Sequence, residues 1–371
     1  MKVALYYAGM ANDARHTEQI GLALSDDGAK FSRAENDGLI VPRDDAVPWK
    51  NLRTCNPTVL TDPSLGEYLM FYQGIGNPRG ARYRVTDNLI TSLALARSKD
   101  GVKWVSAAEP ILSYQDMRQI DPDLDESRSI GVIEPSVLYH DRLWHMWFVY
   151  FHHSFSGNAL FHAVSENLTE WSIYPSPILQ GADFPGFDIH YPQAIHEDSS
   201  WQLWFTLRDR VTGGHGIFRI HSQDGADWSE PFQVLPPARD GPTLDIRPRQ
   251  RTIPMISLSG RDGRSSNLAK RIWNRLARLS TYYGLYPGQS VVRGIFGYAH
   301  PHLVELGKQR FMYFQFCNLD KGGLTLDVGR VQIENGDITG DIELVFERSA
   351  VTSAWDGYFA ADPYLLVLDN Q

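Results

Sequence analysis

Short runs of alternating apolar and small or polar residues recur along the whole chain, and many are followed by a turn signal. The segment Ile20–Ser25 is one example, and Asp27-Gly28 follows it directly. Alternation with a period of two is typical of a half-buried β-strand. Glycine accepts the positive φ that a tight turn requires. The pattern therefore predicts a protein built from β-hairpins.

Two motifs repeat along the chain. The first is a hairpin turn followed by an aromatic residue, and its copies begin at Ser25, Ser98, Ser165 and Ser222. The second is an X-Pro pair at the start of an apolar strand, with the copies Asn56-Pro57, Glu134-Pro135, Tyr191-Pro192, His300-Pro301 and Asp362-Pro363. Proline is tolerated at the first residue of a strand, where no ladder hydrogen bond is lost. Five such units, each with an aromatic second strand, predict an all-β fold, a five-bladed β-propeller.

The two ends of the chain complement each other. Asp362-Pro363 lies close to the C-terminus, so no aromatic second strand follows it. Lys2–Tyr7 is such a strand without an X-Pro strand before it. We therefore expect the N- and C-terminal strands to share one blade and close the ring, so that residues 1–371 form a single domain.

One stretch, residues 235–288, interrupts the repeat as an insertion. Within it, residues 264–279 place Leu268, Ile272 and Leu276 at helical spacing, with lysine and arginine on the other faces. This basic amphipathic segment is the one substantial helix that the sequence predicts. Two interpretations stay open: the helix packs its apolar face on the propeller, or it contacts an acidic membrane surface.

Composition narrows the class of protein. The chain has 371 residues, of which 43% are hydrophobic, so it can build a large core. The formal net charge of -9 argues against a nucleic-acid partner. Cys55 and Cys317 are too few for a disulfide framework. The N-terminal sequence lacks the pattern of a signal peptide. We therefore expect a cytoplasmic location.

Residues beside the five prolines are candidates for a functional site, because the first strand of each propeller blade lines the central channel. Asp and Glu together suit the cleavage of a glycosidic bond, in which one carboxylic acid protonates the leaving oxygen and a carboxylate activates water or attacks the anomeric carbon. Aromatic residues near the channel mouth would stack on sugar rings. The aromatic candidates are Trp49, Tyr191, Trp355 and Tyr358.

These features resemble the five-bladed propeller glycosidases of glycoside hydrolase family 43 and their relatives in families 32, 68, 117 and 130. The hairpin turns and aromatic second strands carry the resemblance over most of the chain outside the insertion. In family 43 the Asp of an Ala-Asp-Pro triplet is the catalytic base, and Ala361-Asp362-Pro363 matches that triplet. The family's second Asp and its general-acid Glu fall here on Glu134 and on Asp188–Tyr191, so the carboxylate types differ from the family pattern.

The sequence thus favours a glycoside hydrolase-like enzyme that acts on an oligosaccharide or polysaccharide. Asp362 would be the base or nucleophile, Glu134 the acid or second carboxylate, and Asp188 the alternative acid. The residues expected to orient sugar hydroxyls or a carboxylate are Arg53, Asn56, His190 and His300.

Alternatives remain at this point. The same scaffold would serve a glycosyltransferase or a glycoside phosphorylase, with arginine and histidine holding a phosphate, or a glycan-binding propeller without catalysis. We expect no cofactor and no metal, because the histidines lack the spacing of metal ligands. The sequence leaves the oligomeric state and the identity of the sugar open.

Overall fold

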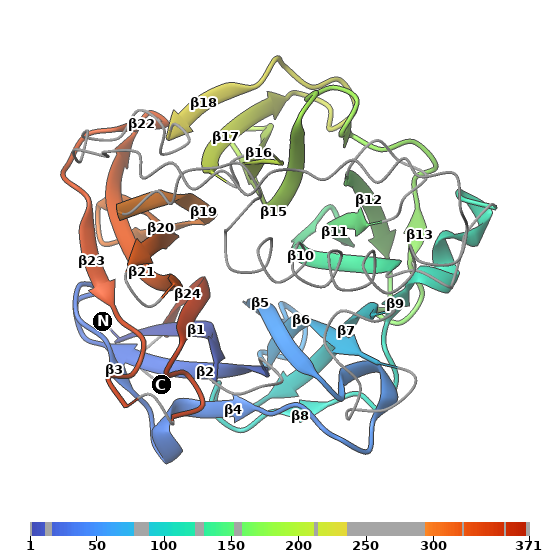
Figure 1. Ribbon diagram of the computed structural model, residues 1–371. Coiled ribbons are helices and arrows are strands. Elements are labelled where there is room, and N and C mark those ends of the chain that lie inside the picture. The colour runs from blue at the N-terminus through green and yellow to red at the C-terminus, as the bar shows by residue number, and fades with distance from the viewer. Residues whose placement is uncertain are drawn as a thin grey trace, which may run out of the picture.

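The computed structural model describes residues 2–11, 17–77, 89–122, 130–151, 158–210, 214–235, 294–320, 323–351 and 354–368. The described part of the chain is nearly all β-strand, and its strands are arranged around a centre (Figure 1). This confirms the predicted all-β, propeller-type class. The predicted helix over residues 264–279 lies outside the described residues. Among the described helices, none is long and apolar enough to cross a membrane.

Antiparallel pairing divides the described strands into five sets. The first set consists of β24 (Phe359–Leu368), β1 (Lys2–Met10), β2 (Glu18–Ser25), β3 (Ser32–Arg33) and β4 (Leu39–Val41). The second consists of β5 (Arg53–Thr61), β6 (Tyr68–Gly76), β7 (Ile90–Ser98), β8 (Val105–Ser106) and β9 (Leu112–Ser113). The third consists of β10 (Ile130–His140), β11 (Leu143–Phe151), β12 (Ala159–Ser165), β13 (Ser172–Ile173) and β14 (Leu179–Gln180).

The fourth set consists of β15 (Phe187–Glu197), β16 (Ser200–Asp209), β17 (His215–Ser222) and β18 (Phe232–Leu235). The fifth consists of β19 (Gly294–Leu306), β20 (Gln309–Asp320), β21 (Gly323–Glu334), β22 (Asp337–Ile338) and β23 (Glu343–Phe346). Three short 3₁₀ helices are described as well, namely η1 (Asn36–Gly38), η2 (Pro48–Lys50) and η3 (Tyr114–Gln119).

The first strand of each set carries one X-Pro pair and lies nearest the centre in Figure 1. Short parallel pairings join neighbouring sets, between β2 and β5, β7 and β10, β17 and β19, and β21 and β24. At the junction of the third and fourth sets, Asn158 Nδ2 donates to the carbonyl of Ile189 at 3.1 Å. In the first set β1 pairs with both β24 and β2, so strands from the two ends of the chain lie side by side.

Side-chain-to-backbone hydrogen bonds within each hairpin turn stabilise the turn. In the copy that begins at Ser98, the hydroxyl accepts from the backbone N of Gly101 at 2.9 Å. Asp100 Oδ1 accepts from the backbone N of Lys103 at 2.7 Å and of Val102 at 2.9 Å, and these bonds lower the pKa of Asp100. Gly101 has a φ of 71°, the left-handed conformation that favours glycine.

Aromatic side chains of the second strands contact these turns in the neighbouring set. We call a hydrogen bond from such a side chain to the carbonyl of the turn glycine a latch. The Tyr6 hydroxyl, buried on β1, donates to the carbonyl of Gly101 in the second set at 3.0 Å. The ring of Trp104 stands edge-on to Tyr6, with 5.9 Å between the ring centroids. Tyr313 on β20 makes the same kind of bond to the carbonyl of Gly28. The predicted aromatic second strands therefore pack between sets.

Replacing Tyr6 with phenylalanine should remove one latch. The Trp104 indole N–H also donates to the Gly101 carbonyl, at 3.1 Å, so that carbonyl keeps a partner. We therefore expect the free energy of unfolding to fall by about 1 kcal/mol, the net value of one hydrogen bond. Urea titration measures this, with Tyr174→Phe as control because Tyr174 is 50% exposed. An equal loss in both variants would mean that the latch contributes nothing specific.

Candidate functional site

The residue before each repeated proline has a positive φ. The values are 52° for Asn56, 58° for Glu134, 51° for Tyr191, 55° for His300 and 51° for Asp362. At each of these positions the pairing with the second strand shifts register, as in a β-bulge. A positive φ is costly for residues other than glycine, and such strain gathers at functional sites. We call these five residues the ring.

Two ring members are carboxylates that accept from the backbone of the next set. Asp362 Oδ2 accepts from the backbone N of Asn56 at 3.3 Å, and Glu134 Oε2 accepts from the backbone N of Tyr191 at 2.8 Å. Both side chains are buried. Each carboxylate therefore fixes the backbone of the neighbouring ring residue.

The other three ring N–H groups donate to second-strand side chains of the preceding set. The acceptors are Gln73 Oε1 for Glu134 at 3.3 Å, Thr206 Oγ1 for His300 at 3.0 Å and Gln315 Oε1 for Asp362 at 3.4 Å. The corresponding second-strand residues of the third and first sets are Val149 and Ala8, whose side chains have no acceptor. From these two sets, the ring carboxylates Glu134 and Asp362 accept from the next ring N–H instead. The sequence reasoning missed these three acceptors.

Each ring carboxylate also contacts a histidine. Asp362 Oδ1 lies 3.2 Å from His300 Nδ1, and Glu134 Oε1 lies 2.9 Å from His190 Nδ1. Asn158 Nδ2 donates to His190 Nε2 at 3.3 Å, so neutral His190 carries its proton on Nδ1 and donates to Glu134. Both oxygens of Glu134 thus face N–H donors.

Tyr191 brings an aromatic face to the same place. Its ring stacks on His300, with 4.7 Å between the centroids and 16° between the planes. Tyr191 and Tyr358 pack against one apolar cluster that includes Met10 and Ala361. Seven of the expected site residues therefore lie in one region, namely the five ring members, His190 and Tyr358.

A further carboxylate, Glu18, completes this region, and the sequence reasoning missed it. Glu18 begins β2 opposite Arg53, and its Oε2 lies 3.4 Å from Arg53 Nη1. Burial raises the pKa of Glu18, Arg53 opposes this, and the charge of Asp362 raises it further. Burial also raises the pKa of the Cys55 thiol beside it, so Cys55 is no thiolate nucleophile. No local motif marks Glu18, because its neighbours come from β5 and β24.

No protein-family model and no curated protein matches the chain. Several solved structures, however, are similar to it. A thermostable family-43 glycoside hydrolase is 14% identical with a TM-score of 0.54, and the match covers 94% of this chain and 93% of that chain. An endo-1,4-β-xylanase from Bacteroides thetaiotaomicron is 12% identical with a TM-score of 0.52, over 92% of both chains. The fold is that of the propeller glycosidases.

A structure from a study of family 130 is similar to the same degree. It is 12% identical with a TM-score of 0.53, and the match covers 86% of this chain and 82% of that chain. That family of mannoside phosphorylases contains glycoside hydrolases that target β-1,2 mannosidic linkages in Candida mannan. At these identities the likeness establishes the fold, which confirms the expected resemblance at that level. The activity has to be argued from the residues.

The structure places Trp49 and Trp355 in packing positions. Each lies eight residues before a ring proline. Trp49 packs on Gly74 and donates to the carbonyl of Ala108 at 3.2 Å. Trp355 packs on Gly9 and stacks on Tyr7. These indole contacts join strands within and between sets, and they involve no ring residue.

Asp188 pairs with an arginine of its own set. Its Oδ1 pairs with Arg210 Nε at 2.8 Å, and the two side chains are 23% and 33% exposed. The charge of Asp188 is therefore already compensated by a neighbour on its own set. Within the described ranges, no group of three histidine, cysteine or acidic side chains is arranged to hold a metal ion.

Proposed function

We propose that this protein binds a carbohydrate at the ring and hydrolyses a glycosidic bond there. The observation that carries the proposal is the position of Glu18, a carboxyl group with a raised pKa, in the electrostatic field of the fixed carboxylate of Asp362. Glycoside cleavage requires a carboxylic acid and a carboxylate at one site. The stacked Tyr191 adds an apolar face for a sugar ring.

The two carboxyl groups take different roles in this proposal. Asp362 is held by Asn56 and His300, and it activates water or attacks the anomeric carbon. Glu18 gives its proton to the leaving oxygen, because a raised pKa keeps the carboxyl group protonated at higher pH. Arg53 orients the Glu18 side chain.

Glu134 fits a positioning role better than the acid role suggested by its place in the sequence. Both of its oxygens face N–H donors, so neither is placed to give a proton to a substrate. Glu134 instead fixes the His190 ring and the backbone of Tyr191. Arg53, the arginine of this region, pairs with the carboxyl group of Glu18, and this pairing favours hydrolysis over phosphorolysis, in which a cation would have to hold a phosphate.

A glycan-binding propeller without catalysis is the second candidate. The observation in its favour is that Asp362 and Glu134 both accept from ring backbone N–H groups, a role that the architecture alone requires. Turnover separates the two functions. A panel of nitrophenyl glycosides and natural oligosaccharides should contain at least one that the protein cleaves, whereas the second candidate predicts binding without cleavage of any.

Glu18→Gln should lower turnover of 4-nitrophenyl and natural glycosides by about 10²–10⁴-fold. Loss with a 2,4-dinitrophenyl leaving group should be much smaller, because that group departs without protonation. The basic limb of the pH profile, set in the wild type by a raised pKa, should disappear in the variant. Glu343→Gln is the matched control, since Glu343 pairs with Arg330 Nε at 2.7 Å in the fifth set. Equal losses with both leaving groups would remove Glu18 from the acid role.

A further inference from the structure

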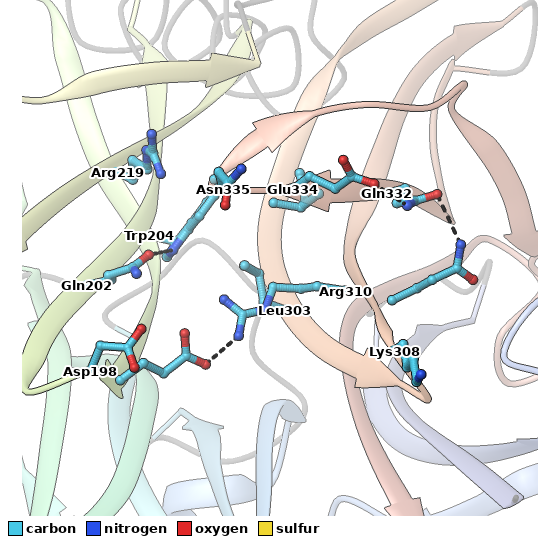
Figure 2. A pocket seen from close by; sticks show the side chains of 14 residues that line it. Asp198, Gln202, Trp204, Arg219, Leu303, Lys308, Arg310, Gln332, Glu334 and Asn335 are labelled. Atoms are coloured by element: carbon cyan, nitrogen blue, oxygen red, sulfur yellow. Dashed lines mark hydrogen bonds and ion pairs between the residues drawn. The ribbon is translucent and has the colours of Figure 1, made fainter.

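A cavity lies between the fourth and fifth sets. It has a volume of about 780 Å³ and is lined from β16 and β17 on one side and from β20 and β21 on the other (Figure 2). Asp198, at the turn after β15, lines it, while Tyr191 lies in the middle of the same strand. Seven residues of strand at roughly 3.3 Å each separate the two by roughly 20 Å.

Among the described hydrogen bonds, the second strand of the fourth set forms no latch like those of Tyr6 and Tyr313. Trp204 pairs across from Gln193 as Tyr313 pairs across from His302, so Trp204 occupies the latch position of its set. Its indole N–H donates to Gln202 of its own strand, at 3.3 Å. The turn of the fifth set is Glu334-Asn335-Gly336, without the serine and aspartate of the other turns. The cavity lies between these hairpins.

The charges around the cavity balance. Its lining has three carboxylates, Glu197, Asp198 and Glu334, and three cations, Arg219, Lys308 and Arg310. Arg310 Nη2 lies 2.6 Å from Glu197 and 2.7 Å from Glu305, so its charge is compensated within the protein. The Arg219 guanidinium lies over the rings of Trp204 and Phe232. A lining without net charge favours an uncharged ligand.

Amide side chains supply the remaining polar groups. Gln202, Gln309, Gln332 and Asn335 line the cavity, and each offers two donors and one acceptor oxygen. Gln309 Nε2 donates to Gln332 Oε1 at 3.4 Å, and Gln332 Nε2 donates to Glu334 Oε1 at 3.0 Å, so each of these two amide nitrogens keeps one further N–H for another partner. Neighbouring hydroxyl groups on a sugar ring present matching acceptors and donors. Leu303 adds an apolar contact on the same wall.

We propose that this cavity is a second binding site for a neutral saccharide, separate from the ring. The inference goes beyond the proposed function, because binding here requires neither Asp362 nor Glu18. It also gives the cavity a defined chemistry: hydroxyl groups in the amide- and carboxylate-lined space, and no anionic group.

Calorimetric titration with xylohexaose, arabinohexaose and mannohexaose tests the proposal. The Asp362→Asn variant is used because it slows turnover, and the wild-type protein serves for any probe that it does not cleave. At least one probe should bind, and the double substitution Gln309→Ala/Gln332→Ala should weaken that binding by about tenfold or more. Gln115→Ala is the control, because Gln115 is an exposed amide on η3.

The outcomes are distinct from those of the cleavage test. Binding of a neutral probe that depends on Gln309 and Gln332 supports the second site even if the protein cleaves no glycoside. Unchanged affinity in the double variant, or no binding of any neutral probe, overturns the proposal. Binding of hexagalacturonate in preference to the neutral probes overturns the assignment to an uncharged saccharide.

Discussion

Turnover of a cleaved glycoside should fall by about 10²–10⁴-fold when Asp362 is replaced with asparagine, while the fold is kept. The asparagine oxygen can still accept from the backbone N of Asn56, so the ring retains that hydrogen bond. The negative charge is lost, however, and with it the ability to activate water or to attack the anomeric carbon. Steady-state kinetics on the best substrate of the panel measures the effect.

Asp327→Asn is the matched control for this substitution. Asp327 is buried on β21, and its Oδ1 accepts from the backbone N of Arg348 at 3.1 Å. Like Asp362, it is buried and accepts a hydrogen bond from a backbone N–H, but its partner is Arg348 and not a ring residue. Full activity in Asp327→Asn with loss in Asp362→Asn is the expected pair of results. Retained activity in Asp362→Asn would contradict the catalytic role and leave Asp362 with its structural one.

Stability should fall as the pH drops below about 6.5, and His302 is one cause. His302 is 4% exposed on β19, and burial lowers its pKa from 6.5 to about 3. Its Nε2 donates to the carbonyl of Leu365 at 3.0 Å, and its Nδ1 accepts from Gln193 Nε2, also at 3.0 Å. A proton on Nδ1 would face the Gln193 donor, so the folded protein keeps His302 neutral.

The direction of the effect follows from proton binding. Between pH 6.5 and 3 the unfolded chain binds a proton at this histidine and the folded chain does not, so acid favours unfolding. The stabilisation is complete above the unfolded pKa and is lost as the pH falls. From pH 6.5 to 5 we expect His302 to account for about 2 kcal/mol of lost stability, at about 1.4 kcal/mol per pH unit. His162 acts in the same direction, since its pKa is also lowered to about 3 by burial.

Urea unfolding at several pH values checks this. His302→Gln keeps a donor for Leu365 and an acceptor for Gln193 but does not titrate, so its stability should depend less steeply on pH. His162→Phe keeps the stacking on Trp147 and tests the second group if the first variant does not fold. Identical pH slopes in wild type and both variants would show that other groups cause the acid sensitivity.

The repeats made much of the fold predictable. An X-Pro pair and a Ser-Asp-Gly turn are local features, and each marks a strand start or a hairpin wherever it occurs. The same repeat pointed to the ring, because residues at equivalent positions of equivalent strands meet around one centre. Asn56 and Asp362, for example, are bonded to each other although they lie 306 residues apart.

The features that the sequence did not reveal depend on how strands pair, both between sets and within a set. Glu18 meets Arg53 only because β2 and β5 pair in parallel at their first residues. Gln73 and Gln315 reach the ring because of the register between first and second strands. The packing role of Trp355 had a signal that went unused: Gly9, in an otherwise bulky strand, leaves the space that the indole fills.

The shared first set has a consequence for synthesis on the ribosome. β1 ends at Met10 and β24 begins at Phe359, so its inner partner emerges about 350 residues later. At typical translation rates that delay is roughly 20–70 s. During this time the nascent strand Val3–Met10, wholly buried in the finished protein, can pair with β2 but has its other edge open. β1 therefore leaves the ribosome long before β24, and it is among the last strands to be covered on both edges.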